Sequence, residues 1–143
     1  MNRGRIKLEG GAELERKLKA IDAKLAKSIV KKALRAGAKV VLKAAKAKAP
    51  RKSGLLVKSL KVRSAKAKKG TVRMAVQTRE GDFKGETFYA AFTEFGHRVG
   101  KRKLGSARKV VEAKPFLGPA FDESKDEAAR AITETIKQGL SDL

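Results

Sequence analysis

The sequence contains no cysteine, no tryptophan, one tyrosine and one histidine in 143 residues. Without cysteine, disulfides and thiolate metal sites are excluded, which agrees with an intracellular site of synthesis. No apolar run approaches the roughly 18 residues of a membrane span, and the basic N-terminus lacks the apolar segment of a secretion signal. We therefore expect a soluble, unprocessed protein that has no membrane partner.

Acidic residues are missing from a long part of the chain, since no carboxylate occurs between Asp22 and Glu80. Residues 1–79 carry 25 Lys and Arg against four acids, whereas residues 80–143 carry 11 of each, so the first half holds the whole net charge of +21. Such a stretch cannot neutralise itself through i,i+4 pairs. Its counter-charge must come from solvent ions, from the acidic C-terminal segment, or from a partner such as nucleic acid or an acidic protein face.

Apolar periodicity predicts a helix at each end of the chain. Spacings of three and four over residues 12–49 indicate one long amphipathic helix, or two helices broken near residues 21–23, ending before Pro50. A second, acidic helix is expected from Phe116 onward, with Gly139 as its end. Because it carries more acids than bases, this helix is expected to lie over the basic half.

A small sheet is expected between the two helical regions. Residues 71–78 alternate with the period of a half-buried strand and should pair with a strand near Val62 through a Lys-rich turn. Residues 98–114 hold seven bases, one acid and two glycines, which predicts a long, mobile basic loop that serves as a contact surface.

This order of elements predicts a single α+β domain over residues 1–143, with residues 1–10 as a flexible N-terminus. The long N-terminal amphipathic helix and the C-terminal helix are expected to pack on a small antiparallel β-sheet.

The window FYAAFTEFGH, residues 88–97, holds four of the seven aromatic residues and the one histidine. In a short helix, Phe88, Phe92 and Phe95 would share one face. Core packing is the favoured interpretation, and base stacking on single-stranded nucleic acid is the alternative. The predicted core residues are Tyr89, Phe92, Phe95, Phe116, Leu117 and Phe121.

Catalytic chemistry has little support in the sequence. His97 has no second histidine, cysteine or paired carboxylate near it, so a loop residue is favoured over a general base, and its role stays open. The triplet Asp82-Phe83-Lys84 matches a fragment of a nuclease metal site, but glycines flank it and a solvated turn is the simpler interpretation. We expect no catalytic residue, no metal and no cofactor.

Three segments taken together resemble a known family. They are AKAKAPRKSGLLVKSL (residues 45–60), YAAFTEFGH (89–97) and AKPFLGPAF (113–121). In this order and spacing they are similar to elements of the tail-completion or head-to-tail connector proteins of siphovirus-type phages and prophages.

The resemblance implies a small α+β subunit that forms a homo-oligomeric ring at the neck of the particle and performs no catalysis. It implies synthesis in the host bacterial cytoplasm and a place in the virion. Its expected partners are further copies of itself, the head connector or adaptor, and the tail terminator or tail tube proteins, with contact to packaged DNA left open.

The basic residues of two segments are the predicted contacts with these partners. They are Arg51, Lys52, Arg98, Lys101, Arg102, Lys103, Arg108 and Lys109. The leading hypothesis is a structural phage assembly protein that joins the tail to the DNA-filled head. The alternative, which rests on charge alone, is a basic accessory protein that binds DNA without sequence specificity.

Overall fold

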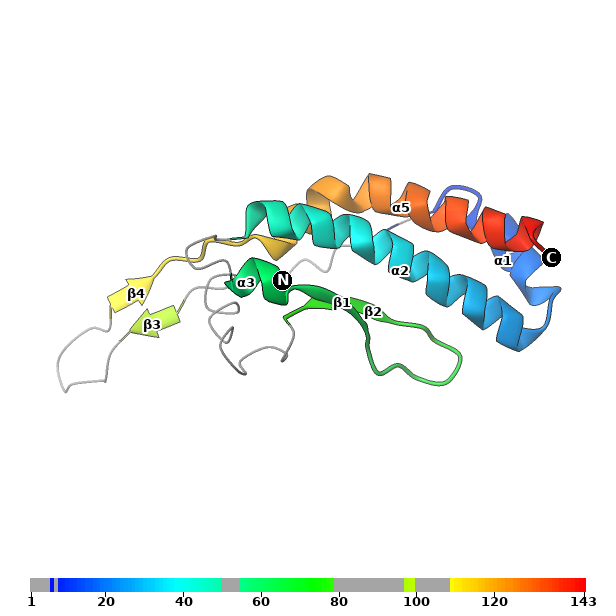
Figure 1. Ribbon diagram of the computed structural model, residues 1–143, viewed down its shortest axis with the longest axis horizontal. Helices are drawn as coiled ribbons and strands as arrows, with labels where there is room; N and C mark the ends of the chain where they lie inside the picture. Colours follow the sequence, from blue (N-terminus) through cyan, green and yellow to red (C-terminus); the bar gives the residue numbers. More distant parts are fainter. Residues whose placement is uncertain (1–5, 7, 50–54, 79–96, 100–108) are drawn as a thin grey trace.

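The chain combines long helices with two small hairpins. The computed structural model describes residues 6, 8–49, 55–78, 97–99 and 109–143. In chain order the elements are α1 (Gly11–Lys19), α2 (Ala23–Lys48), α3 (Leu55–Ser59), β1 (Lys61–Ser64), β2 (Met74–Gln77), β3 (His97–Val99), β4 (Lys109–Val111) and α5 (Leu117–Ser141) (Figure 1). The expected α+β class is therefore confirmed.

Asp22 separates the first two helices by capping α2. Its carboxylate accepts hydrogen bonds from the backbone N–H groups of Lys24 (2.9 Å) and Leu25 (3.2 Å). These bonds satisfy two of the amides that a helix N-terminus leaves unpaired. Of the two arrangements that the periodicity allowed, the broken pair of helices is correct. At the other end of α2, Ala49 takes the extended conformation that residues before proline favour.

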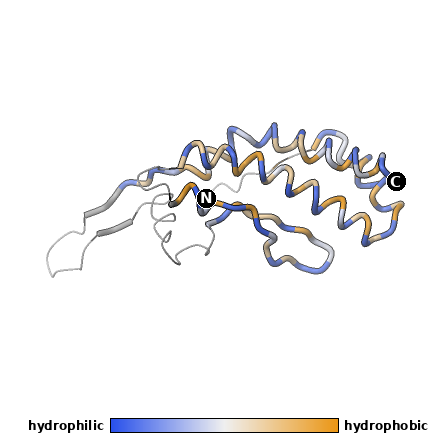
Figure 2. Tube along the Cα trace, in the orientation of Figure 1, coloured by the Kyte–Doolittle hydropathy of each residue, from blue (hydrophilic) through white to orange (hydrophobic). Residues whose placement is uncertain are grey.

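The antiparallel pair of α2 and α5 is the largest packed unit of the molecule (Figure 1). Each helix buries a row of residues with strict i,i+4 spacing, and Figure 2 shows the alternation of hydrophobic and hydrophilic residues along both helices. The rows are Ile29, Ala33, Gly37, Val41 and Ala45 in α2, and Ala120, Ser124, Ala128, Ile132 and Ile136 in α5. Most of these side chains are small, so the two backbones approach closely.

Two glycines make this approach possible. A Cβ atom at Gly37 would lie 2.6 Å from Cγ1 of Ile132, and a Cβ atom at Gly139 would lie 2.9 Å from Cγ2 of Ile29. Ile132 of α5 therefore packs against Gly37 of α2, and Ile29 of α2 packs against Gly139 of α5. The expectation that Gly139 ends the C-terminal helix is wrong, because α5 continues to Ser141 and the glycine makes room for Ile29.

The predicted central hairpin is present as β1 and β2, which pair in antiparallel register from Lys61 opposite Gln77 to Ser64 opposite Met74. Both strands contact α2. Val76 packs on a buried cluster formed by Leu56 and Leu60, from α3 and the residue before β1, together with Phe116 and three alanines. The short helix α3 directly precedes this hairpin.

A second antiparallel hairpin pairs His97 with Val111, Arg98 with Val110, and Val99 with Lys109. Residues 98–99 and 109–111 fall within the segment 98–114 that is predicted as a basic loop. These parts of the segment are strands, because cross-strand hydrogen bonds satisfy the backbone there. The intervening residues 100–108 lie outside the described part of the chain.

The aromatic window also lies outside the described part of the chain, except for His97 at the start of β3. The core packing predicted for Tyr89, Phe92 and Phe95 thus stays a prediction.

Candidate functional site

Five basic residues form a regular row along the exposed side of α2. We name Lys27, Lys31, Arg35, Lys39 and Lys43 the cationic row; all five are exposed. They follow each other at i,i+4 and lie two positions from the buried row of the same helix, which is about 200° around the axis. The row therefore runs along the side of α2 that faces away from α5, over about 24 Å.

No acidic residue of α2 compensates this row, since the helix carries nine Lys and Arg and no Asp or Glu. Helix α1 shows the usual arrangement, in which acids and bases at i,i+4 form ion pairs. There Glu13 pairs with Lys17 at 3.1 Å and Glu15 with Lys19 at 2.9 Å. The hydrogen bond and the charge of the lysine lower the pKa of each glutamate.

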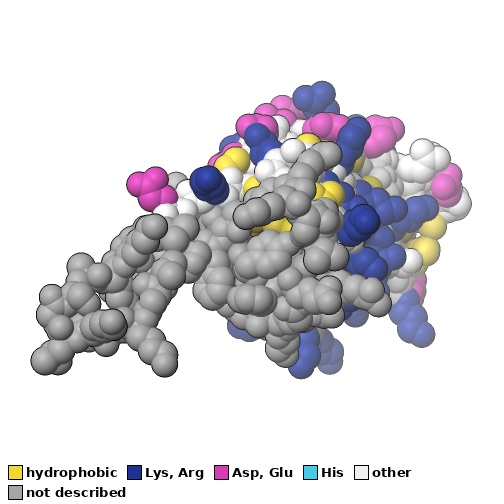
Figure 3. All heavy atoms as spheres, turned by 60° about the vertical axis from the view of Figure 1, so that its left-hand side comes forward, with side chains coloured by type: hydrophobic (Ala, Val, Ile, Leu, Met, Phe, Trp, Pro, Cys, Tyr) yellow, Lys and Arg dark blue, Asp and Glu magenta, His cyan; other side chains and the backbone are white. Residues whose placement is uncertain are grey.

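Helix α5 lies along α2, as its acidity suggested, yet it does not neutralise the cationic row. The two helices meet through the uncharged buried rows, and α5 exposes Asp122, Asp126 and Glu134 on its outer side. Among the described residues, one ion pair links the two helices, between Lys48 Nζ and Glu123 Oε1 at 2.8 Å. Figure 3 shows acidic side chains gathered along one edge of the molecule and Lys and Arg side chains over the surface beside them.

The row opposes the stability of its own helix. Four consecutive like-charge pairs at i,i+4 destabilise an exposed helix by about 1–2 kcal/mol in total at low ionic strength. A sequence selected for folding alone would place some acids here, as α1 does. The row is therefore best explained by a partner that supplies negative charge.

The destabilisation of α2 by the cationic row can be measured with Lys31→Glu. The change converts two repulsive pairs, with Lys27 and Arg35, into attractive ones, so the free energy of unfolding should rise by about 1 kcal/mol at low salt. Lys31→Gln, which only removes repulsion, should give about half of that gain. Denaturant unfolding at low and high salt checks this, because screening should shrink both gains. An equal effect at all salt concentrations would contradict the electrostatic origin.

The β1–β2 hairpin carries a second group of bases. Val62 and Val76 are paired and half-buried on the side toward α2, so the residues that alternate with them, Lys61, Arg63 and Arg73, lie on the outer side. Lys66, Lys68 and Lys69 follow in the exposed turn. The hairpin thus has six exposed bases and no acid over residues 60–78.

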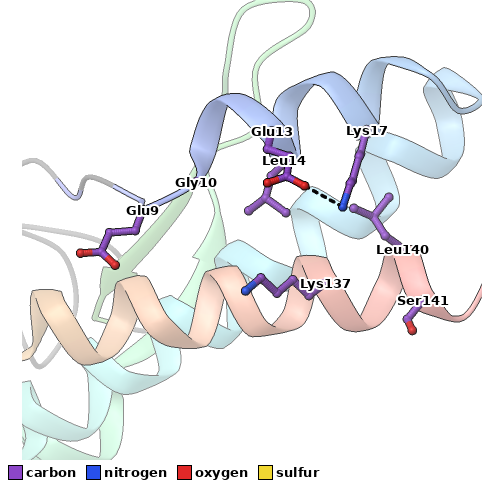
Figure 4. Close-up of a pocket in the computed structure, with 8 residues that line it drawn as sticks. All are labelled: Glu9, Gly10, Glu13, Leu14, Lys17, Lys137, Leu140 and Ser141. Carbon is purple, nitrogen blue, oxygen red and sulfur yellow. Dashed lines mark ion pairs between the residues drawn. The ribbon is translucent and has the colours of Figure 1, made fainter.

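A pocket of about 430 Å³ lies between the start of α1 and the end of α5 (Figure 4). Its lining is Glu9, Gly10, Glu13, Leu14, Lys17, Lys137, Leu140 and Ser141. Leucines line part of it, and the Glu13–Lys17 ion pair crosses one side. These eight residues include no histidine and no cysteine, so the lining lacks the side chains that most often form a nucleophile–base pair.

Among the residues that the structure describes, no group of three or more His, Asp or Glu could hold a metal ion. Within the same part of the chain, no helix is both long and apolar enough to cross a membrane.

Comparison with known proteins agrees with the resemblance noted in the sequence. A family model described as "Bacteriophage HK97-gp10, putative tail-component" matches residues 12–96. The chain belongs to this HK97-gp10-like family of phage tail components. The match covers α1 except Gly11, together with α2, α3, β1 and β2, and with them the whole cationic row. No curated protein and no solved structure matches the chain.

Most of the predicted contact residues of this tail component lie outside the described part of the chain. Arg51, Lys52, Lys101, Arg102, Lys103 and Arg108 lie outside the described residues. Arg98 is in β3 and Lys109 in β4, in adjacent cross-strand pairs, with Arg98 opposite Val110 and Lys109 opposite Val99. Of the predicted core residues in the described part, Phe116 is 1% exposed, and Leu117 and Phe121 are half-buried.

The cationic row was not among the predicted contacts of this tail component. Its signal was present in the sequence as five cations at strict i,i+4 spacing within a helix without acids. What the sequence did not show was which side of the helix α5 would cover.

Proposed function

We propose that this phage tail component is a tail-completion or head-to-tail connector subunit that forms a ring at the neck and joins the tail to the DNA-filled head. Three observations support the proposal: the family match, the three neck-protein motifs and the cationic row. The row is the observation that carries it, because an exposed helix side without any acid needs counter-charge from outside the subunit.

Such a subunit acts by surface complementarity and needs no chemistry of its own. Ring contacts would be heterologous, with one patch of each copy against a different patch of the next. The further partners are the head connector or adaptor and the tail terminator or tail tube. The Arg51–Lys52 segment and the basic residues between Arg98 and Lys109 remain the proposed contacts with these proteins.

Electron microscopy of lysates from a phage or prophage that lacks this gene tests the proposal. We expect filled heads beside separate tails, and restoration of joined particles when the native gene is supplied. Mass spectrometry of purified particles should then detect the protein in the virion. Joined, infectious particles in the absence of the gene would refute the neck role.

The same complementation assay tests the contact surfaces. Reversing the charge of the predicted loop residues should leave heads and tails separate. These residues are Lys101, Arg102, Lys103, Arg108 and Lys109. The matched control reverses the charge of five exposed bases of the β1–β2 hairpin, which are Lys61, Lys66, Lys68, Lys69 and Arg73. Normal assembly with the loop variant would remove the loop from the contact surface while leaving the neck role intact.

A further inference from the structure

We propose that the cationic row of α2 binds the phosphate backbone of duplex DNA without reading the base sequence. The proposal goes beyond the neck role and does not depend on it, because it rests on the charge, spacing and surroundings of five described residues.

The positive charges of the row are arranged along a straight line. Residues at i,i+4 rise about 6 Å along a helix, so the row presents a cation at that interval over about 24 Å. A duplex carries one phosphate per roughly 1.7 Å of its axis, and each Lys or Arg that meets a phosphate releases a condensed counterion. A straight row of five flexible, exposed cations can follow such a backbone.

The row lacks the apolar centre that is typical of a protein–protein interface. Protein interfaces are centred on buried apolar or aromatic anchors, whereas protein–DNA interfaces are polar and strongly positive. Among the described residues, the large hydrophobic side chains that are exposed are Leu25, at 40%, and Leu143, at 60%. Leu25 extends the buried row of α2, four positions before Ile29, so it lies on the other side of the helix. The cationic row therefore has no apolar centre for a protein partner.

The residue types of α2 indicate contact with the backbone of duplex DNA. Helix α2 has no aromatic residue, so it offers no platform on which single-stranded bases could stack. Four of the five row residues are lysines, which act as point charges, whereas base recognition favours the bidentate geometry of arginine. Both features indicate contact with the duplex backbone and equal affinity for duplexes of different sequence.

Binding alone would prove little, because a protein of net charge +21 attracts DNA through its total charge. The test therefore compares two variants that lose the same charge. The row variant changes Lys27, Lys31, Arg35, Lys39 and Lys43 to Gln. The control variant changes Lys61, Lys66, Lys68, Lys69 and Arg73 of the hairpin to Gln, so each loses four lysines and one arginine.

The measured quantity is the slope of the logarithm of the association constant against the logarithm of salt concentration, for a short labelled duplex. Five phosphate contacts contribute about 4.5 units of slope, equivalent to a loss of affinity of about 500-fold between roughly 50 and 200 mM salt. The row variant should lose about four of these units. The control variant should lose less than half as much.

A third variant separates charge from folding. Changing the four lysines of the row to arginine keeps the charge and should retain the native slope. Circular dichroism and thermal unfolding should show that the Gln row variant is folded, since removal of like-charge repulsion favours the helix.

Two results would overturn the proposal. Equal losses of slope in the row and control variants would mean that DNA responds to total charge and not to the row. A native slope in the row variant, together with loss of self-association or of particle assembly, would make the row a contact with an acidic protein. Either result leaves the neck role to be judged by the assembly assay.

Discussion

Phe116→Ala is expected to lower the free energy of unfolding by about 3–5 kcal/mol, the range for removing a large buried aromatic side chain. Phe116 is 1% exposed and is the largest of the fully buried side chains in the described part of the chain. Its cluster includes Leu56 and Leu60 with Ala45 and Ala120. Phe116 therefore connects the α2–α5 pair to α3 and the residue before β1, and its loss leaves a cavity at this junction.

Denaturant unfolding of Phe116→Ala, Phe116→Leu and Phe121→Ala checks this expectation. Phe116→Leu retains part of the buried volume and should lose less. Phe121 is half-buried in the first turns of α5, which Phe116 precedes, so its truncation is the matched control and should cost clearly less than that of Phe116. Equal losses at the two positions would contradict the placement of Phe116 at the centre of the cluster.

Gly37→Val is expected to destabilise the protein by about 3 kcal/mol, the upper end for overpacking in a well-packed core. A Cβ atom at Gly37 would lie 2.6 Å from Cγ1 and 2.7 Å from Cδ1 of Ile132, and 3.3 Å from the backbone oxygen of Ala128. Since the backbone oxygen cannot rotate away, the two helices must separate. The higher helix propensity of valine, a few tenths of a kcal/mol above glycine, does not offset this.

A size-swapped double variant makes the test specific. Ile132→Ala removes the carbons that a side chain at position 37 would meet, so Gly37→Val combined with Ile132→Ala should be more stable than the sum of the single losses predicts. The expected coupling is about 1–3 kcal/mol. Gly11→Ala, where the new Cβ would meet Leu8 at 3.7 Å, is the neutral control. Additive losses at positions 37 and 132 would show that the two helices do not approach as closely as described.

Elements with strong local signals agree with the sequence. The periodicity allowed one long helix or a break near residues 21–23, and the break is present because the short carboxylate of Asp22 accepts from the next backbone amides. The β1–β2 hairpin follows from the alternation of residues 71–78, which has the period of a strand exposed on one side. Each signal spans a few neighbouring residues, so the sequence carries it without knowledge of the fold.

The errors arose where a residue serves a contact distant in the sequence. Gly139 was expected to end a helix because glycine weakens helices, but here its missing side chain accommodates Ile29, more than 100 positions away. The composition of residues 98–114, with seven bases, one acid and two glycines, predicts a loop, yet residues 98–99 and 109–111 are strands. Strand pairing across residues 100–108 overrides that local preference.

By itself, the sequence determined the helical and strand periods, the acid-free basic half and the motifs that relate the chain to phage tail components, since all of these depend on the order and spacing of neighbouring residues. Only the tertiary structure decided that α5 covers the buried row of α2 and leaves Lys27, Lys31, Arg35, Lys39 and Lys43 exposed on the opposite side. The reason is that glycines and alanines form a close-packing surface only when a second helix with complementary isoleucines lies against them, and that choice fixes which side of α2 faces a partner.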